Sequence, residues 1–211
     1  MGHIALHYQR PEDGPIAAKL LQLLGFVETQ DLPLPGGHFY RFVVDQRHQA
    51  RGDGILYLSA APEAQVALVQ AIRTALKVGT PEEHPAAAGM RAALEADPET
   101  TFHVGFLIDS LETLERTVLG VREQAQTDPD LKGRVRVKLN RARRGDGDVD
   151  ARLDASPLYG DVDRYAYGRN GVQAFIETDL LTSGPLGESL VIELDYVFPG
   201  ATSHLLSVVE L

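Results

Sequence analysis

Residues 101–120, TFHVGFLIDSLETLERTVLG, carry the pattern that decides the fold. A short apolar run that opens on His103 predicts a strand. Asp109 and Ser110 follow it, and both residue types favour the N-terminus of a helix. Two glutamates in the next six positions suit the positive end of the helix dipole. The stretch therefore predicts a strand that leads directly into a helix.

The same order opens the chain, where residues 2–25 read GHIALHYQRPEDGPIAAKLLQLLG. His3 begins an apolar strand, Pro15 suits the first turn of a helix, and Gly25 is a natural helix stop. Each of the two stretches is followed by three further predicted strands. These are residues 26–34, 38–45 and 54–60 in the first half and residues 134–139, 171–180 and 188–198 in the second.

Two copies of a β-α-β-β-β unit indicate an α+β protein. One such unit cannot close a sheet alone, so we expect the two modules to pair into a concave, partly closed mixed sheet barrel. The intervening residues have no counterpart elsewhere and predict an extra helical connection between the modules. The expected division is a first module in 1–59, the helical connection in 60–100, a second module in 101–198 and a C-terminal tail in 199–211.

Composition narrows the classes of function. The chain has 211 residues, 44% of them hydrophobic and 24% charged, as in an ordinary globular protein. It contains no Cys, so disulfides, thiolate nucleophiles and Cys-based metal sites are excluded. The net charge of −10 disfavours a nucleic-acid partner. Neither a membrane span nor a signal peptide is indicated, and a cytoplasmic location is expected.

Two charged stretches lie in the second half. In residues 132–144, basic and apolar residues alternate, which favours a strand with a solvated basic face; a surface for an anionic ligand or partner is the alternative. Residues 145–163 are strongly acidic. They lack the spacing of a calcium-binding loop, and a mobile loop or lid is the favoured interpretation.

The repeated order, with His3 and His103 at matching positions and Glu193 in the last strand, resembles the vicinal oxygen chelate superfamily. That superfamily includes glyoxalase I, extradiol dioxygenases and the bleomycin-resistance proteins. The resemblance covers residues 1–59 and 101–198. It implies a metal site in which His3, His103 and Glu193 are the ligands. Tyr57 stands where a fourth ligand is expected, or Ser59 if the register differs by two residues.

Two histidines and one carboxylate match the ligand set of non-haem Fe(II) oxygenases. The resemblance therefore implies a divalent metal, with Fe(II) favoured over Mn, Zn or Ni. It also implies a small aromatic or oxo-acid substrate bound through two neighbouring oxygens. His7 and Tyr167 are candidates for acid–base or substrate-orienting roles beside the metal, and His38, Tyr40 and Tyr165 are weaker candidates.

Two alternatives stay open on the sequence. One is a glyoxalase-like lyase or isomerase, and the other is a binding or resistance protein of the same fold that catalyses nothing. The partner in each case is a small molecule, with neither nucleic acid nor membrane involved. The two modules are expected to pair within a monomer or to be exchanged in a homodimer.

Overall fold

The first module is a four-stranded sheet with one helix. It comprises β1 (His3–Tyr8), α1 (Asp13–Leu23), β2 (Val27–Leu34), β3 (Gly37–Val43) and β4 (Ile55–Ala60), with a short 3-10 turn at Gln46–His48. β1 runs parallel to β4, and the other pairs are antiparallel, which gives the order β2-β3-β4-β1. The computed structural model describes residues 2–50, 52–100, 102–166, 168 and 170–200, without the side chain of His48.

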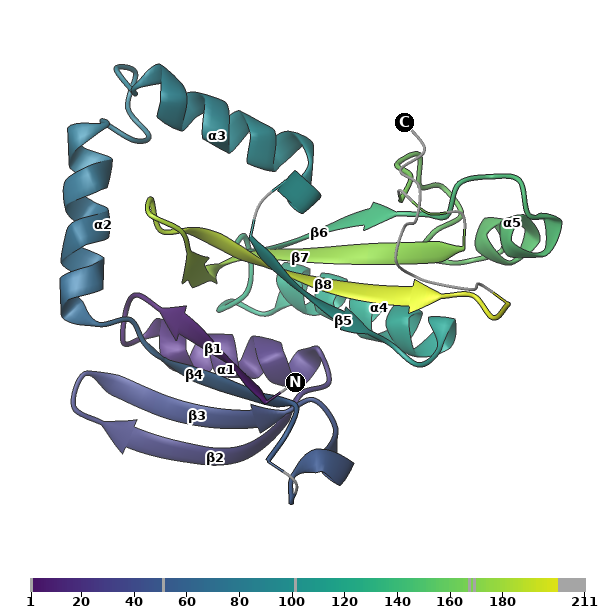
Figure 1. Cartoon of the computed structure of the whole chain (residues 1–211), viewed down its shortest axis with the longest axis horizontal. Coiled ribbons are helices and arrows are strands. Elements are labelled where there is room, and N and C mark those ends of the chain that lie inside the picture. Colours follow the sequence, from purple (N-terminus) through teal and green to yellow (C-terminus); the bar gives the residue numbers. More distant parts are fainter. Residues whose placement is uncertain (1, 51, 101, 167, 169, 201–211) are drawn as a thin grey trace.

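The second module repeats this arrangement. It comprises β5 (His103–Leu107), α4 (Leu111–Thr127), β6 (Val135–Asn140), β7 (Gly171–Ser183) and β8 (Glu188–Val197). β5 runs parallel to β8, as β1 does to β4, so the order is β6-β7-β8-β5. The repeated β-α-β-β-β order predicted from the sequence is confirmed (Figure 1).

The two modules join into one eight-stranded mixed sheet through β7. One edge of β7 pairs with β6 along its first half and meets β1 at the pair His7–Thr182. Between these partners the register with β8 shifts from Thr178 to Thr182. The expected barrel is wrong, because the sheet does not close: β2 and β5 remain at opposite ends of the strand order.

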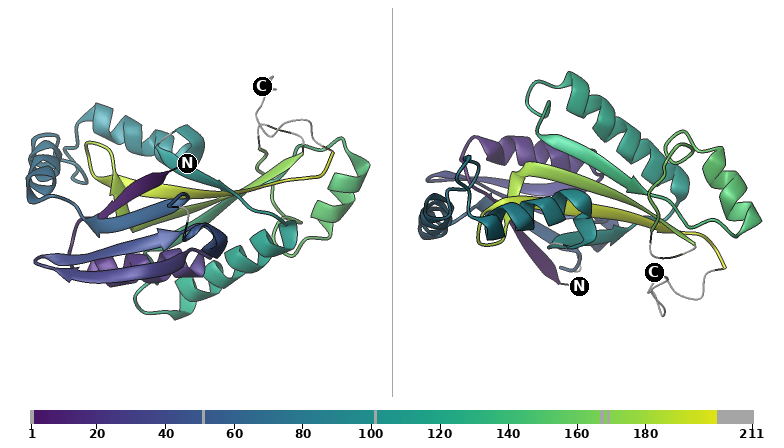
Figure 2. Two further views of the ribbon diagram at one scale, coloured as in Figure 1. Left: turned by 60° about the horizontal axis from the view of Figure 1, so that its bottom comes forward. Right: turned by 90° about the horizontal axis from the view of Figure 1, so that it is seen from above.

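A single apolar core lies on one face of the sheet. Alternate strand residues such as Leu6, Leu58 and Ile192 point to this face, and they pack with Leu20 of α1 and Leu114 of α4. Figure 2 shows both helices on this side. Because successive strand residues point to opposite faces, the residues between these apolar ones lie on the other face of the sheet, and many of them are polar.

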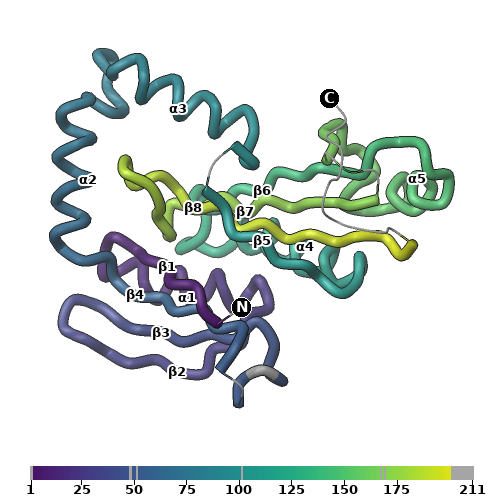
Figure 3. Tube along the Cα trace, in the orientation of Figure 1, coloured from purple at the N-terminus to yellow at the C-terminus, as the bar shows by residue number. Residues whose placement is uncertain are grey.

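The connection between the modules contains α2 (Glu63–Ala75), α3 (Pro85–Ala96) and a 3-10 turn, η2 (Pro98–Thr100). These helices form an arch on the face opposite α1 and α4 (Figures 1 and 3). Val69 is the buried residue of α2 and Ala87 that of α3. In the described part of the chain, no helix combines the length and apolarity needed to cross a membrane.

The acidic stretch 145–163 contains a helix, α5 (Gly147–Asp154), which the sequence pattern did not predict. The Asp146 side chain caps it by accepting hydrogen bonds from the backbone N–H groups of Asp148 and Val149. Arg152 fastens α5 to α4 through an ion pair with the buried Glu115. Part of the expected loop is therefore a helix packed against the second module.

The basic stretch 132–144 forms β6 and the residues around it. Arg134 pairs with Asp13 and Asp179, while Arg136 and Lys138 pair with Glu177. The Arg136 side chain is 66% exposed, but those of Arg134 and Lys138 are only 19% exposed. The expected solvated face is thus correct for Arg136, whereas its two neighbours are largely covered ion-pair partners.

Candidate functional site on the open face of the second module

The strands of the second module place polar side chains in neighbouring positions on the face opposite α4. β5 and β8 align His103 with Val191 and Gly105 with Glu193. Residues two apart in a strand share a face. His103 and Glu193 therefore stand on the same face of adjacent strands.

His103 and Glu193 are in direct contact. The Nε2 atom of His103 lies 3.2 Å from Oε2 of Glu193, whose side chain is 8% exposed. The other carboxylate oxygen, Oε1, accepts a hydrogen bond of 2.6 Å from the Gln173 side-chain amide. Gly105 leaves room for this arrangement, because a Cβ atom there would lie 3.3 Å from Oε2 of Glu193.

Two further carboxyl groups lie beside this pair. Burial, together with the charge of Glu193, raises the pKa of Asp195 to about 8. Burial also raises the pKa of Glu99 in η2, although a hydrogen bond from Gln173 partly offsets the effect. Among the described atoms, Oδ1 of Asp195 and Oε1 of Glu99 are buried without a hydrogen-bond partner. The site is thus rich in acceptors and short of donors.

The predicted ligands of the first module form a separate group. The rings of His3 and Tyr57 lie 5.2 Å apart, and Tyr57 lies 5.4 Å from Phe39. Nδ1 of His7 is 3.3 Å from the Ser59 hydroxyl. β7 and β8 separate β1 from β5 in the strand order, so His3 and His103 start strands that are not neighbours.

The geometry fits a metal ion in part. Donor atoms about 2.0–2.2 Å from one ion, at right angles, lie about 3 Å apart, which is close to the separation of His103 Nε2 and Glu193 Oε2. Across the described residues, however, no three or more His, Asp or Glu side chains are grouped so that they could hold a metal. The set of His3, His103 and Glu193 therefore stays a prediction.

The remaining candidates have other contacts, are exposed or lie outside the described residues. Tyr167 is outside the described residues. His38 pairs with Asp31 at 2.7 Å and stacks on Tyr40 with ring centroids 5.5 Å apart. Tyr165 is 47% exposed. None of these contacts involves His103 or Glu193.

A cavity of about 900 Å³ opens on the same side of the molecule, between the helical connection and the sheet. Arg73 of α2 and Arg91 of α3 line one wall, and Arg136, Glu177 and Val191 line the sheet wall. Val191 is two residues from Glu193 and opposite His103 in the register. The cavity therefore borders this face of the sheet through Val191, although neither His103 nor Glu193 lines it. Its volume is large enough for a small molecule.

Sequence reasoning missed Glu99, Asn140 and Gln173. Gln173 and Asn140 are polar residues within apolar strands, and that alternation is the only signal that could have pointed to them. Glu99 lies in the connection, where no pattern indicates contact with the site.

The fold and the polar face define a two-module β-α-β-β-β protein with a histidine–carboxylate pair, in line with the resemblance to the vicinal oxygen chelate superfamily. No protein-family profile and no curated protein matches the sequence. One similar solved structure is that of a possible glyoxalase from Bacillus cereus. It shares 13% identity over 91% of this chain and 96% of that chain, with a TM-score of 0.35.

Proposed function

We propose that the chain is an enzyme of the vicinal oxygen chelate type that acts on a small molecule at the open face of the second module, with His103 and Glu193 at its centre. The observation that carries the proposal is the 3.2 Å contact between these side chains. A nearly buried carboxylate held against an imidazole is costly to build without a role, and such groups cluster at functional sites.

The narrower form of this proposal includes a divalent metal, with Fe(II) favoured. His103 Nε2 and Glu193 Oε2 would hold it, and the metal would polarise substrate oxygens or mediate electron transfer to dioxygen. Oε2 of Glu193 faces His103, whereas Oε1 accepts the hydrogen bond from Gln173. A substrate carrying two neighbouring oxygens suits this form, which is that of a dioxygenase.

A glyoxalase-like lyase or isomerase is the second candidate. Its support is the pair of further carboxyl groups, Asp195 and Glu99, beside Glu193. A carboxylate within reach of bound substrate can move a proton between neighbouring carbon atoms. Substrate panels separate the two candidates: oxygen uptake with catechols or 2-oxo acids indicates the first, and isomerisation of 2-oxoaldehyde adducts indicates the second.

Metal binding is the first test. We expect the protein, loaded anaerobically with Fe(II), Mn(II), Zn(II) or Ni(II), to bind one equivalent by calorimetry. His103→Ala and Glu193→Gln should weaken binding by at least about 10-fold, since each removes one of few ligands. His38→Ala is the matched control, because His38 pairs with Asp31 away from the site.

Unchanged metal affinity in both variants would contradict the metal-dependent form. His3→Ala then decides the predicted ligand set: a loss equal to that of His103→Ala assigns His3 to the site, and no loss removes it.

A further inference from the structure

A continuous line of side-chain hydrogen bonds crosses the second module and ends on the His103–Glu193 pair. Arg164 Nε donates to Oδ1 of Asn140 at 3.0 Å, and Nδ2 of Asn140 donates to Oε1 of Gln173 at 3.1 Å. Nε2 of Gln173 then donates to Glu193 at 2.6 Å. Asn140 is 4% exposed and Glu193 is 6% exposed, so two of the four side chains in the line are buried.

The two end groups, the Arg164 guanidinium and the Glu193 carboxylate, allow the donors in this line to point in one direction only, from Arg164 toward Glu193. A guanidinium has donors and no acceptor, so the oxygen of Asn140 must face Arg164. The Asn140 amide group is then left to donate, and the oxygen of Gln173 must face it. The Gln173 amide group is in turn left to donate to Glu193, which accepts as a carboxylate. The orientation of both side-chain amides, Asn140 and Gln173, is therefore determined by Arg164 at one end and by Glu193 at the other.

We propose that Arg164, Asn140 and Gln173 are positioning residues that hold Glu193, and through it His103, in the orientation the site requires. This inference rests on the proposed function of the His103–Glu193 pair. The line engages Oε1 of Glu193, while Oε2 faces His103, so the two oxygens of the carboxylate have different partners. A short hydrogen bond to a charged acceptor is also stronger than a neutral one, which limits rotation of Glu193.

The same line fastens the helical connection to the site. Arg164 also donates to the backbone carbonyl of Ala96 at 3.0 Å, and Lys138 donates to that of Glu95 at 2.8 Å. Both carbonyls lie at the end of α3, where helix carbonyls lack intrahelical partners. Glu99 follows in η2 and shares the Gln173 amide with Glu193. The connection is thus tied to the positioning residues at its C-terminal end.

The segment between β6 and β7 that contains α5 determines the position of Arg164. The chain leaves β6 at Arg141 and returns to pair there with Tyr165. The backbone N–H of Arg141 donates to the carbonyl of Arg164 at 3.0 Å. This return sets the Arg164 side chain beside Asn140. This segment therefore supplies Arg164, the donor that sets the orientation of the Asn140 amide at the start of the line.

Asn140→Asp tests the proposal with almost no change in size. The carboxylate introduced by this change still accepts from Arg164 but cannot donate, so Gln173 must turn its amide group away from Glu193. We expect the side-chain amide proton of Gln173 that donates to Glu193 to shift upfield in 15N-edited NMR spectra. We also expect Zn(II) affinity to fall by about 10- to 100-fold, the usual cost of losing a partner of a metal ligand.

Asn170→Asp is the matched control, because it makes the same chemical change outside the line, and it should alter neither signal. Arg164→Met, at the half-exposed end, removes the donor and serves as a second variant if Asn140→Asp fails to fold, and it should change both readouts in the same direction. An unmoved Gln173 resonance, or a moved resonance with wild-type Zn(II) affinity, overturns the positioning role. Absence of Zn(II) binding in the wild type would instead defeat the metal-dependent function, while the Gln173 resonance still tests the line.

Discussion

Tyr8 links sequence to stability at the scale of one residue. Its side chain is fully buried, and its hydroxyl donates to the backbone carbonyl of His38 and accepts from the His38 N–H, each at 2.7 Å. Gly37 makes this possible, because a Cβ atom there would lie 2.4 Å from the hydroxyl oxygen and its φ of +148° disfavours other residues. Tyr8 thus ties β1 to the start of β3.

Tyr8→Phe should lower the free energy of unfolding by about 1–3 kcal/mol, because it leaves two backbone groups of His38 without their partner. The measurement is urea unfolding followed by circular dichroism. Tyr165→Phe is the control and should change stability by less than about 0.5 kcal/mol, as expected at an exposed position. An equal loss of unfolding free energy in the two variants would show that the hydrogen bonds of the Tyr8 hydroxyl do not stabilise the fold.

At the scale of elements, the helix predicted in the opening stretch is confirmed. The Ser110 side chain accepts from the N–H of Thr113, and α4 runs from Leu111 to Thr127. The cap and the apolar period are local signals, so the sequence contains them in full. α5 was missed because its acidic residues give a weak apolar pattern, with only Val149 and Leu153 buried.

The site could be predicted only in part for a related reason. Strand alternation placed Glu193 and Asp195 on one face, and the structure agrees, because the side chains of both lie beside Gly105. The partners Asn140 and Gln173 depend on which strands are neighbours and in what register. Register is set by long-range pairing that no local pattern records.

The helical connection gives a test at this scale. Leu68 of α2 is 61% exposed, whereas its neighbour Val69 is buried. Val69 packs against the β7–β8 turn at Gly187, where an added Cβ atom would lie 2.8 Å from it. Val69→Ala should lower the local unfolding free energy of α2 by about 1.5 kcal/mol, and Leu68→Ala should leave it unchanged.

Hydrogen exchange of the α2 amides measures this difference. Faster exchange confined to α2 in Val69→Ala supports docking through Val69. Equally fast exchange in Leu68→Ala would contradict docking through Val69.

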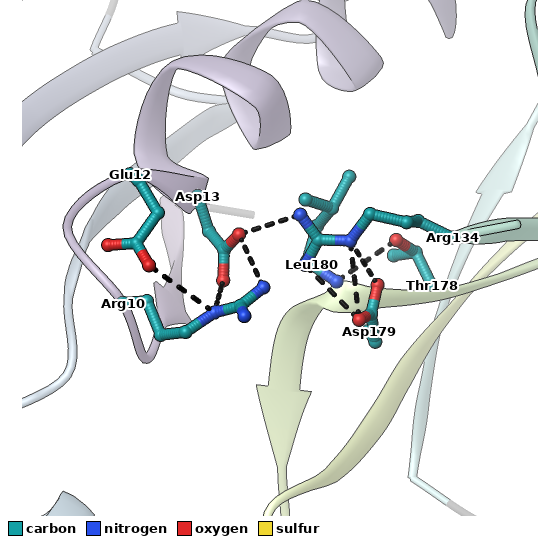
Figure 4. Close-up of polar contacts among 7 residues, drawn as sticks. All are labelled: Arg10, Glu12, Asp13, Arg134, Thr178, Asp179 and Leu180. Atoms are coloured by element: carbon teal, nitrogen blue, oxygen red, sulfur yellow. Dashed lines mark hydrogen bonds and ion pairs between the residues drawn. The ribbon is translucent and has the colours of Figure 1, made fainter. Parts of the chain in front are cut away.

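At the scale of the whole molecule, a charge network joins the two modules (Figure 4). Asp13 of α1, 2% exposed, accepts from Arg10 at 2.8 Å and from Arg134 beside β6 at 2.7 Å. Arg134 also donates to Asp179 of β7 at 2.9 Å. The network lies close to the register shift in β7. It therefore supports the junction between the modules, where β1 and β7 share only the pair His7–Thr182.

Asp13→Asn should lower the free energy of unfolding by about 2 kcal/mol, because it leaves partly buried guanidinium groups with a weaker acceptor. Asp179→Asn is the control, since its side chain is 57% exposed and should contribute less than about 1 kcal/mol. Chemical unfolding at pH 7 measures both. If the two modules unfold in separate transitions only in Asp13→Asn, the loss of stability arises at the junction between them.

The same residue predicts a pH dependence. Burial opposes ionisation of Asp13, but hydrogen bonds from Arg10 and Arg134 outweigh it and hold its pKa below the ordinary value of 3.8. A lowered pKa adds stability above the unfolded-state pKa, and that stability is lost as the pH falls through the folded-state value. Wild-type stability should therefore decline below about pH 4 more steeply than that of Asp13→Asn. Parallel declines would contradict this account.

The pairing of first strand with last strand also sets an order of assembly on the ribosome. β1 finds β4 within the first sixty residues, whereas β5 at His103 must wait for Val191 to be made. The outer edge of β1 gains its partner only when Thr182 emerges. During synthesis the edge of β1 that faces β7 therefore stays without its partner until most of the second module has been made, and an unpaired strand edge is open to pairing with other chains.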